Sequence, residues 1–371
     1  MLQLAGLLYA GLHPFHTPPN QVSWVPDANA LRFGDYGTIL TQQPFAPPAR
    51  RERSVEIWMK PGMIEDSNTL LAFYSPDNPR QLSLMQSLSD LEVAIQTSFA
   101  WRRTKTDRFY IDNAFRGGGT AFWTFTFGSS ATTVYRDGVL IRKTPITPSA
   151  GEMSGRLVVA NSPVFSEPWS GVLKGLAVFD TKLDADAVGR HYSSWTKSGT
   201  PVLSAGDSCV ALYLFDEHGG RVVHNRARGE NDLYIPTKFT ILRQSVLDPP
   251  WRAFNWHAGY WKDASVNLAG FMPFGFCLCA YLSARNWRSP VLWASVIGGV
   301  VSAVIELTQT QLPTRDSSMS DLLDNFLGSV FGALAYRGTA ARLFYEMILW
   351  AQNRLRGSGR ETECAQPTLP G

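Results

Sequence analysis

The pattern of hydrophobic and polar positions divides the chain into two parts. From about residue 22 to 250, short alternating runs are separated by Gly, Pro, Asn and Asp, which is typical of an antiparallel β-sandwich. From 264 to 336 the runs are long, apolar and nearly free of charge, which predicts membrane-spanning helices. We therefore expect a multidomain protein, with an all-β antiparallel sandwich joined to an α-helical transmembrane bundle.

Several segments of the polar part have the period of strands. An Asp-Gly pair at Asp137 and Gly138 predicts a tight hairpin between two of them. Residues 183–195 begin with an acidic turn and predict a short helix. The predicted strands lie at 54–62, 120–128, 132–141, 156–162 and 171–180.

The apolar part predicts three helices, and the N-terminal segment makes a fourth if it crosses the membrane. Residues 264–284 contain no charge and are long enough to span about 30 Å of hydrocarbon. Residues 289–310 form the next expected span and 322–336 a shorter one. Residues 2–12 are apolar but short, so they are either a truncated first helix or a frayed apolar terminus. The expected bundle has three to four helices.

These patterns define four regions. Residues 1–20 are an N-terminal membrane segment, 21–250 the sandwich, 251–337 the transmembrane helices, and 338–371 a cytoplasmic tail that is partly amphipathic and partly disordered. Tryptophan and tyrosine interleaved with basic residues at 251–262 predict an interfacial belt ahead of the first long span, with a sugar platform as the alternative.

Positive charge predicts the orientation of the bundle. Arg285 and Arg288 between the first two long spans, and the arginine-rich tail, should face the cytoplasm. The hairpin around Arg315 and the sandwich should then be extracytoplasmic. We expect a multi-pass protein of the bacterial inner membrane, with membrane lipid as one partner.

Composition excludes several classes of protein. The formal net charge is only +3 and no basic stripe with stacking aromatics occurs, so no nucleic-acid partner is expected. The four cysteines are scattered, which excludes a disulfide framework or a CxxC metal pair. No nucleophile elbow, zinc-protease motif or phosphate loop is present.

The polar residues of the apolar part fall into stripes. Ser302, Glu306 and Gln309 share one helical face, and Asp321 and Asn325 share another with Gly328 and Gly332. Carboxylates in hydrocarbon are costly, so such residues often mark a site. The competing interpretation is that they only hold helices together, with the two glycines allowing close approach.

This stretch resembles the VanZ-like family. The matching residues are a first helix with Asn267, Phe271, Pro273 and Gly275, then Ser302, Ile305, Glu306 and Gln309, Arg315 in the hairpin, and Asp321, Asn325 and Gly328. The resemblance implies a cell-envelope membrane protein, with a link to reduced sensitivity to glycopeptide antibiotics of the teicoplanin type.

The sandwich resembles the laminin-G-like, concanavalin A-like jelly roll. The resemblance is carried by residues 30–37, 55–61, 135–138 and 169–180, and a further piece at 211–227 looks like another strand pair that either completes or extends the sandwich. Such domains bind glycans or proteins, sometimes with calcium. Asp35, Asp112, Asn113 and Asn161 are available acceptors, but Asp and Asn in turns are more often turn formers, so no metal site is assigned. No glucanase carboxylate set is present.

The expected topology brings polar residues of three helices to one depth, within about 10 Å of the outer surface. We expect a candidate cluster of Asn267, Glu306, Gln309, Arg315, Asp321 and Asn325. Two functions follow. Either the chain is a non-enzymatic envelope protein that displays a glycan- or protein-binding sandwich, or Glu306 or Asp321 serves as acid or base of an intramembrane enzyme acting on a lipid-linked saccharide. No cofactor is expected beyond calcium in the sandwich.

Overall fold

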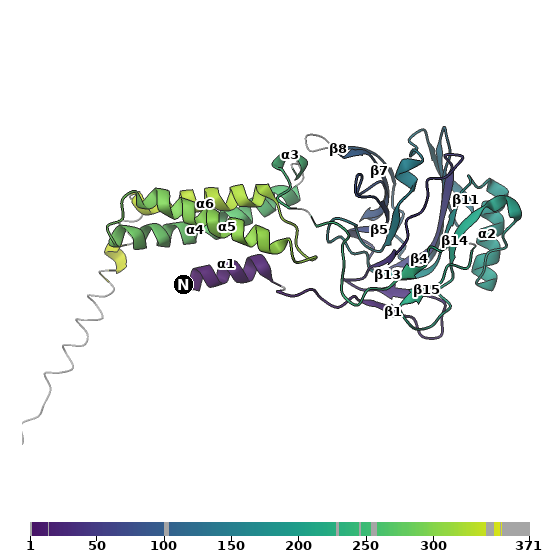
Figure 1. The fold of residues 1–371 in the computed structure, drawn as a ribbon, viewed down its shortest axis with the longest axis horizontal. Helices are drawn as coiled ribbons and strands as arrows, with labels where there is room; N and C mark the ends of the chain where they lie inside the picture. Colours follow the sequence, from purple (N-terminus) through teal and green to yellow (C-terminus); the bar gives the residue numbers. More distant parts are fainter. Residues whose placement is uncertain are drawn as a thin grey trace, which may run out of the picture. The chain divides into compact units, whose positions relative to one another are not determined.

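The computed structural model forms two units, each described here by itself (Figure 1). The sandwich unit comprises residues 14–245 and 310–316, and the helical unit comprises 1–13, 246–309 and 317–371. The residues that the structure describes are 2–13, 15–99, 104–227, 230–244, 246–253, 258–338, 345–348 and 350.

Two antiparallel eight-stranded sheets form the sandwich in the described residues. The first sheet has the order β1-β2-β13-β4-β9-β10-β11, and β14 also pairs with β13. Its strands are β1 (Val22–Trp24), β2 (Leu31–Phe33), β4 (Arg53–Pro61), β9 (Ala121–Phe127), β10 (Thr132–Arg136), β11 (Val139–Thr144), β13 (Gly171–Phe179) and β14 (Cys209–Tyr213).

The second sheet has the order β15-β16-β3-β12-β5-β6-β7-β8. Four of its strands, β5 to β8, are consecutive in the chain and form a meander. The strands are β3 (Ile39–Thr41), β5 (Asp66–Tyr74), β6 (Leu82–Leu88), β7 (Asp90–Phe99), β8 (Thr104–Ile111), β12 (Arg156–Val159), β15 (Val222–Val223) and β16 (Leu233–Tyr234).

In the sandwich, the sequence predicted a local turn correctly but not which strands pair with one another. The Asp-Gly hairpin is confirmed: Arg136 pairs with Val139, and Asp137 and Gly138 both have positive φ, at 52° and 79°. The predicted strand pair at 211–227 is wrong as a pair. Its first strand, β14, joins the first sheet and its second, β15, joins the second sheet, so the segment completes both sheets of one sandwich.

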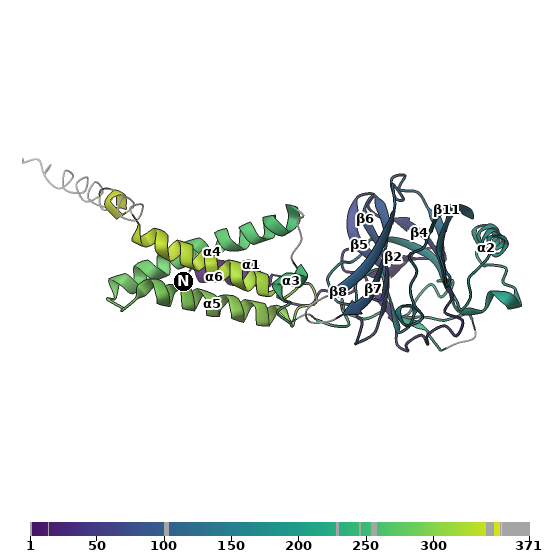
Figure 2. The same ribbon diagram turned by 90° about the horizontal axis from the view of Figure 1, so that it is seen from above.

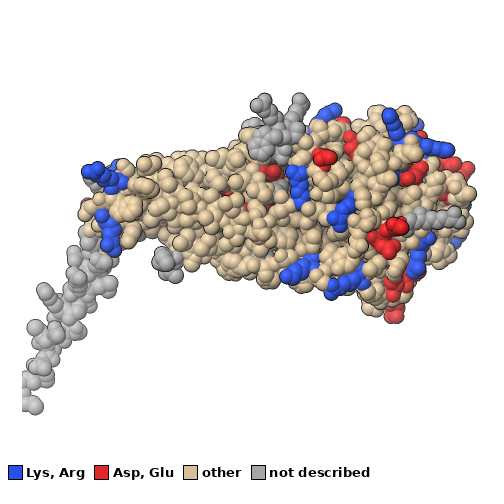
Figure 3. Space-filling view, in the orientation of Figure 1, with Lys and Arg blue, Asp and Glu red and all other residues tan. Residues whose placement is uncertain are grey.

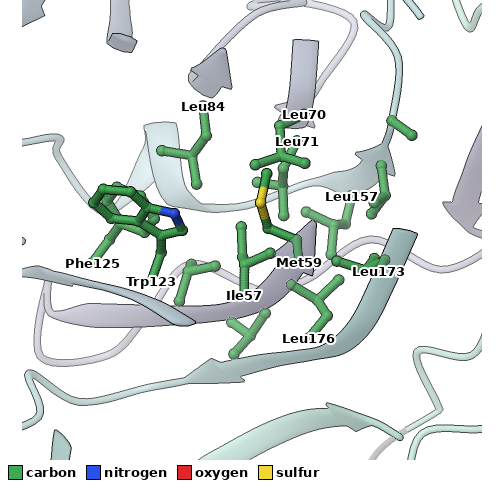
Figure 4. Close-up of a cluster of buried hydrophobic side chains, with 14 of the residues drawn as sticks. Ile57, Met59, Leu70, Leu71, Leu84, Trp123, Phe125, Leu157, Leu173 and Leu176 are labelled. Carbon is green, nitrogen blue, oxygen red and sulfur yellow. The ribbon is translucent and has the colours of Figure 1, made fainter. Parts of the chain in front are cut away.

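The main core lies between the two sheets and consists of alternate side chains of their strands. Figure 4 shows Ile57 and Met59 of β4 facing Leu71 of β5 and Leu157 of β12. Trp123 and Phe125 of β9 extend the same layer. Because alternate residues of β4 point inward, Glu56 and Trp58 point to the other face of the first sheet.

Helix α2 (Ala185–Ser198) covers that other face (Figures 1 and 2). Asp184 caps its first turn by accepting a hydrogen bond from the Ala187 amide, and Gly199 ends it with φ of 78°. Trp195 is fully buried there against Phe122, and its ring lies against Gly175, where any side chain would collide with it. The expected helix at 183–195 is therefore present. Two short 3-10 turns lie at Gly151–Met153 and Ala205–Asp207.

The helical unit contains α1 (Leu2–Leu12), α3 (Pro250–Ala253), α4 (Ala258–Ala284), α5 (Pro290–Gln309) and α6 (Met319–Arg337). Two stretches in its described residues are long and apolar enough to cross a membrane, Trp261–Ala284 and Pro290–Gln309. In an apolar window of 18 residues within each stretch, only 28% and 33% of the residues are buried, whereas the core helices of a water-soluble domain are mostly buried. The predicted count of three to four spans stays a prediction.

Helices α4 and α6 meet along a contact made by glycine. A Cβ atom at Gly328 would collide with the Leu268 carbonyl, and one at Gly332 would collide with the Met272 carbonyl. Because positions 268 and 272 meet 328 and 332 in the same order, the two helices run in the same direction. Small residues allow this approach, which gains dispersion contact along both backbones.

We expect Gly332→Ala to destabilise the helical unit by about 1–3 kcal/mol, because the new methyl group must push α6 away from α4. Thermal unfolding of the purified chain in detergent, followed by helical ellipticity, measures this effect. Gly270→Ala is the matched control in α4, because a Cβ atom at that position would have no atom within 4 Å apart from the neighbouring backbone of its own helix. Equal stability of the two variants would contradict the glycine contact.

Candidate functional site

Five of the six predicted cluster residues belong to the helical unit, and most of them are buried. Glu306 is 2% exposed, Asn325 5% and Gln309 8%, whereas Asn267 and Asp321 are half-buried. Ser302 is completely buried on the same face of α5 as Glu306 and Gln309. We call Asn267, Ser302, Glu306, Gln309, Asp321 and Asn325 the interior polar set.

Side chains of the interior polar set connect α6 to both neighbouring long helices. The Asn267 amide of α4 donates to Asp321 Oδ1 at 2.8 Å. The Asn325 amide donates to the Ser302 hydroxyl of α5 at 3.0 Å. Each bond pairs groups from two helices, as expected of polar residues that hold apolar helices together.

Glu306 serves as an acceptor at the beginning of α6. The Ser318 backbone N–H donates to Glu306 Oε2 at 2.8 Å, and the Ser318 hydroxyl in turn accepts from the Ser320 amide. A carboxylate at a helix N-terminus satisfies an exposed N–H group and interacts favourably with the helix dipole. The sequence showed the stripe that holds Glu306 but not this capping partner.

Gln309 extends the set to the N-terminal helix. Its amide donates to the Gly11 carbonyl of α1 at 2.7 Å. The adjacent side chain of Ile305 fills the space beside Gly11, where a Cβ atom would lie 2.8 Å from it. The short N-terminal helix is thus packed on α5 within the helical unit, and it is only 11 residues long.

Arg315, the sixth predicted residue, lies on the loop 310–316, which groups with the sandwich unit. There the Gln244 amide donates to the carbonyls of Leu312 and Arg315, at 3.0 and 2.6 Å. The structure thus brings five of the predicted residues into one unit. The predicted role of Arg315 in the polar cluster stays a prediction.

Two buried polar atoms of α6, Asn325 Oδ1 and Ser320 Oγ, have no hydrogen-bond partner among the described residues. The Asn325 side chain uses only its amide nitrogen, toward Ser302. An acceptor that is buried without a partner costs free energy, so it is either a reserve for a ligand or a tolerated defect. The described basic residues of this unit form no ion pair with Glu306 or Asp321.

The outer faces of the same helices are apolar. Val300 and Val304 of α5 are 57% and 53% exposed, on the side of the helix opposite Ser302, and Leu292 near the start of the helix is 60% exposed. The large exposed apolar residues of α6 recur every three or four positions, at Leu323, Leu327, Phe331 and Leu334. Figure 3 shows few charged side chains on the visible face of these helices, apart from basic residues at one end. A lipid environment favours this arrangement, in which polar groups lie between the helices and apolar groups face outward.

The sandwich contains a buried ionic network that sequence analysis missed. His191 of α2 lies between two carboxylates, with Nδ1 3.1 Å from Glu56 Oε2 and Nε2 3.0 Å from Asp207 Oδ2. Glu56 and His191 are completely buried and Asp207 is 5% exposed. The available signal was Glu56 itself, an acid in an otherwise apolar strand, but its partner is 135 residues away.

Electrostatics favours a charged His191. Burial alone lowers the pKa of His191, but its hydrogen bonds to Glu56 and Asp207 and their charges outweigh burial and raise it. Burial raises the pKa of Glu56, and its hydrogen bond to His191 only partly offsets this. For Asp207, the opposing effect of burial is overcome by hydrogen bonds from Ser204 and His191, which lower its pKa to about 2. Since all three side chains are enclosed, we assign the network a structural role in docking α2.

The four residues considered as acceptors for calcium lie on separate loops. Asp35 lies between β2 and β3, Asp112 and Asn113 follow β8, and Asn161 follows β12. Asn161 is buried and accepts from the Glu167 amide at 3.1 Å. In the part of the chain that the structure describes, no three His, Cys, Asp or Glu side chains gather as a metal site. Calcium stays an untested expectation.

Comparison with known families agrees with both resemblances. The VanZ/LLP1 family model matches residues 209–344, and the model of the concanavalin A-like lectin/glucanases superfamily matches residues 33–189. The chain therefore combines a concanavalin A-like domain with a VanZ-like region, in that order. The VanZ match begins in β14, within the sandwich unit. No curated protein matches the chain.

Solved structures resemble the sandwich only distantly. A SAP-like pentraxin from Limulus polyphemus is 15% identical over 60% of this chain and 94% of its own, with a TM-score of 0.34. A putative carbohydrate binding protein from Bacteroides ovatus is 12% identical over 61% of each chain, with a TM-score of 0.37. Botulinum neurotoxin type C, whose cell entry depends on two ganglioside molecules, is 11% identical over 47% of this chain, with a TM-score of 0.33. This chain covers 45% of that toxin chain.

The charged network predicts a specific pH dependence of stability. A raised pKa of His191 in the folded state stabilises the fold below its unfolded value of about 6.5, and this contribution is lost as pH rises through the folded pKa. The lowered pKa of Asp207 stabilises the fold above about pH 3.8, and this contribution is lost as pH falls toward 2. We therefore expect His191→Gln to lower the unfolding temperature most near pH 5–6 and progressively less in alkaline buffer.

Thermal unfolding of the full chain in detergent, followed by near-ultraviolet circular dichroism at several pH values, tests this prediction. His224→Gln is the control, because His224 is exposed and pairs with Glu217 at the surface. A loss that stays constant from pH 5 to 9 would show that His191 acts by packing alone.

Proposed function

We propose that this chain is a multi-pass protein of the bacterial inner membrane that displays a glycan- or protein-binding sandwich outside the cytoplasm. The observation that carries the proposal is the inverted distribution of polarity in α5 and α6. Glu306 and Asn325 are buried between helices, while Val300, Val304 and Phe331 are exposed on their outer faces. The VanZ/LLP1 match over these helices supports the same assignment.

The distribution of charge supports an orientation for the helices. Since α4 and α6 run in the same direction, Arg285, Arg288 and Arg337 lie at one end of the unit and Asn267, Glu306 and Asp321 lie toward the other. Under the positive-inside rule the arginine end is cytoplasmic. The polar residues then lie toward the outer leaflet, and four spans result if α1 also crosses.

In this proposal the interior polar set recognises the headgroup of an amphiphile at the outer leaflet, such as a lipid-linked saccharide. Asn325 Oδ1 supplies a buried acceptor that no described residue uses. The sandwich supplies the contact with an envelope glycan or protein. Together the interior polar set and the sandwich would bind envelope polysaccharide or its lipid-linked precursor. This binding would lower sensitivity to teicoplanin-type glycopeptides, as the VanZ-like resemblance implies.

The enzymatic alternative uses Glu306 or Asp321 as an acid or base. Both carboxylates already accept hydrogen bonds that join helices, from the Ser318 amide and the Asn267 side chain. These contacts favour the binding function over catalysis. Turnover of a lipid-linked saccharide that disappears in Glu306→Gln would reverse that preference.

The orientation predicts the outcome of reporter fusions in a bacterial host. We expect alkaline phosphatase fused after Gly199 to be active, because the sandwich faces outward, and a fusion after Arg288 to be inactive. A fluorescent protein that folds only in the cytoplasm should give the opposite pattern. An active phosphatase after Arg288 would overturn the proposed topology.

The polar interior predicts that Asn325→Leu separates function from stability. Loss of one hydrogen bond, worth about 0.6–1.7 kcal/mol between apolar helices, is offset because the unpaired Oδ1 is removed as well. We expect normal insertion and unfolding temperature but loss of any rise in the minimal inhibitory concentration of teicoplanin that the wild-type chain confers on a sensitive host.

Thr308→Ala is the matched control for Asn325→Leu, because Thr308 is an exposed polar residue of α5 whose hydroxyl donates to the Val304 carbonyl of its own helix. Full activity of inserted Asn325→Leu protein would reduce the interior polar set to helix packing. A wild-type chain that leaves teicoplanin sensitivity unchanged would refute the resistance role itself.

A further inference from the structure

A shallow hollow lies at one edge of the sandwich, where the end strands of the two sheets meet. It has a volume of about 700 Å³ and is lined by Trp24, Val25, Pro26, Asp27, Asn29 and His218. Trp24 ends β1, the first strand in the order of one sheet, and His218 precedes β15, the first strand of the other. Figure 1 shows β1 and β15 close together. The volume falls within the range of small-molecule sites.

The aromatic side of the hollow is fixed in position. Trp24 Nε1 donates to the Gly220 carbonyl at 3.1 Å, and the ring packs partly against the main core. The indole is thus held at both its polar atom and its apolar body, while it still contributes to the lining. A rigid aromatic face loses little conformational entropy when a ligand stacks on it.

The polar side of the hollow has unused hydrogen-bonding groups. The side chains of Asp27, Asn29 and His218 are exposed and form no hydrogen bond or ion pair within the described residues. Asp27 and His218 have positive φ angles of 58° and 55°. Non-glycine residues adopt this conformation only at a cost, and here it occurs at two residues that face the same hollow.

The combination of groups selects a class of ligand. A fixed indole offers a surface for the C–H faces of a sugar ring, while a carboxylate, an amide and an imidazole can pair with adjacent hydroxyl groups. Neither Lys nor Arg lines the hollow, so no permanent positive charge in it compensates the charge of an acidic sugar or a phosphate. Asp27 would repel such a ligand.

We infer that this hollow is a binding site for a neutral saccharide, with Trp24 as the stacking platform and Asp27, Asn29 and His218 as hydroxyl ligands. The inference rests on the proposed display function and gives its sandwich a specific site and ligand class. The site uses the strand edge where β1 and β15 meet and none of the candidate calcium oxygens.

Saturation-transfer difference NMR of the full chain tests the site, in a detergent whose headgroup is not a sugar. The probes are four neutral tetrasaccharides: cellotetraose, chitotetraose, maltotetraose and β-1,4-galactotetraose. We expect binding of at least one probe, and a loss of affinity of about tenfold or more in Trp24→Ala and in Asp27→Ala. Asn29→Ala is expected to weaken binding by several-fold.

Tyr110→Ala is the control, because Tyr110 is an exposed aromatic residue of β8, a strand at the opposite end of the second sheet from β15. It should leave affinity unchanged. Asp27 and Asn29 are exposed turn residues, so their variants keep the test valid if Trp24→Ala unfolds. Binding that survives in Asp27→Ala and Asn29→Ala would overturn this site and leave the display function standing. A folded wild-type chain that binds none of the four probes would overturn the site, while protein binding by the sandwich would still support display.

Discussion

The close contact between α4 and α6 is the constraint on which the helical unit depends. Only glycine fits at positions 328 and 332 of α6, because the carbonyls of Leu268 and Met272 occupy the space where a side chain would begin. The contact is reciprocal, since a side chain at Gly275 of α4 would collide with the backbone of Ser329. This contact fixes the register of the two helices. With the register fixed, Asn267 and Asp321 come within hydrogen-bond distance, and α5 can present Ser302 to Asn325.

The stripes of the helical unit could be read from sequence because helical period alone decides which residues share a face. That reasoning placed Ser302, Glu306 and Gln309 together, and all three are buried in the structure. Their partners could not be read, because these depend on the register and the hairpin geometry. Glu306 bonds to the backbone of Ser318, and Gln309 bonds to the carbonyl of Gly11. A backbone partner leaves no signature in the sequence.

In the sandwich, too, local patterns could be predicted from sequence, whereas tertiary partners could not. The Asp137-Gly138 turn was predictable because its chemistry is local, whereas the separation of β14 and β15 into opposite sheets is a tertiary outcome. The network of Glu56, His191 and Asp207 shows the limit most clearly. Taken alone, each residue is an ordinary titratable side chain: Glu56 on a strand, His191 on a helix and Asp207 in a turn. Enclosed together, they form two hydrogen bonds centred on His191, and loss of His191 would leave the buried Glu56 carboxylate without its ionic partner.

The two units satisfy their polar groups in opposite ways, and this determines where a ligand could bind. In the sandwich, apolar side chains are inside, and exposed polar groups such as Asp27 and Asn29 are normally satisfied by water. They become informative only where a fixed aromatic ring joins them, as Trp24 does. In the helical unit the outside is apolar, so a polar atom without a partner cannot turn to water. Asn325 Oδ1 is therefore more informative than an exposed polar atom, because a buried acceptor without a partner among the described residues costs free energy.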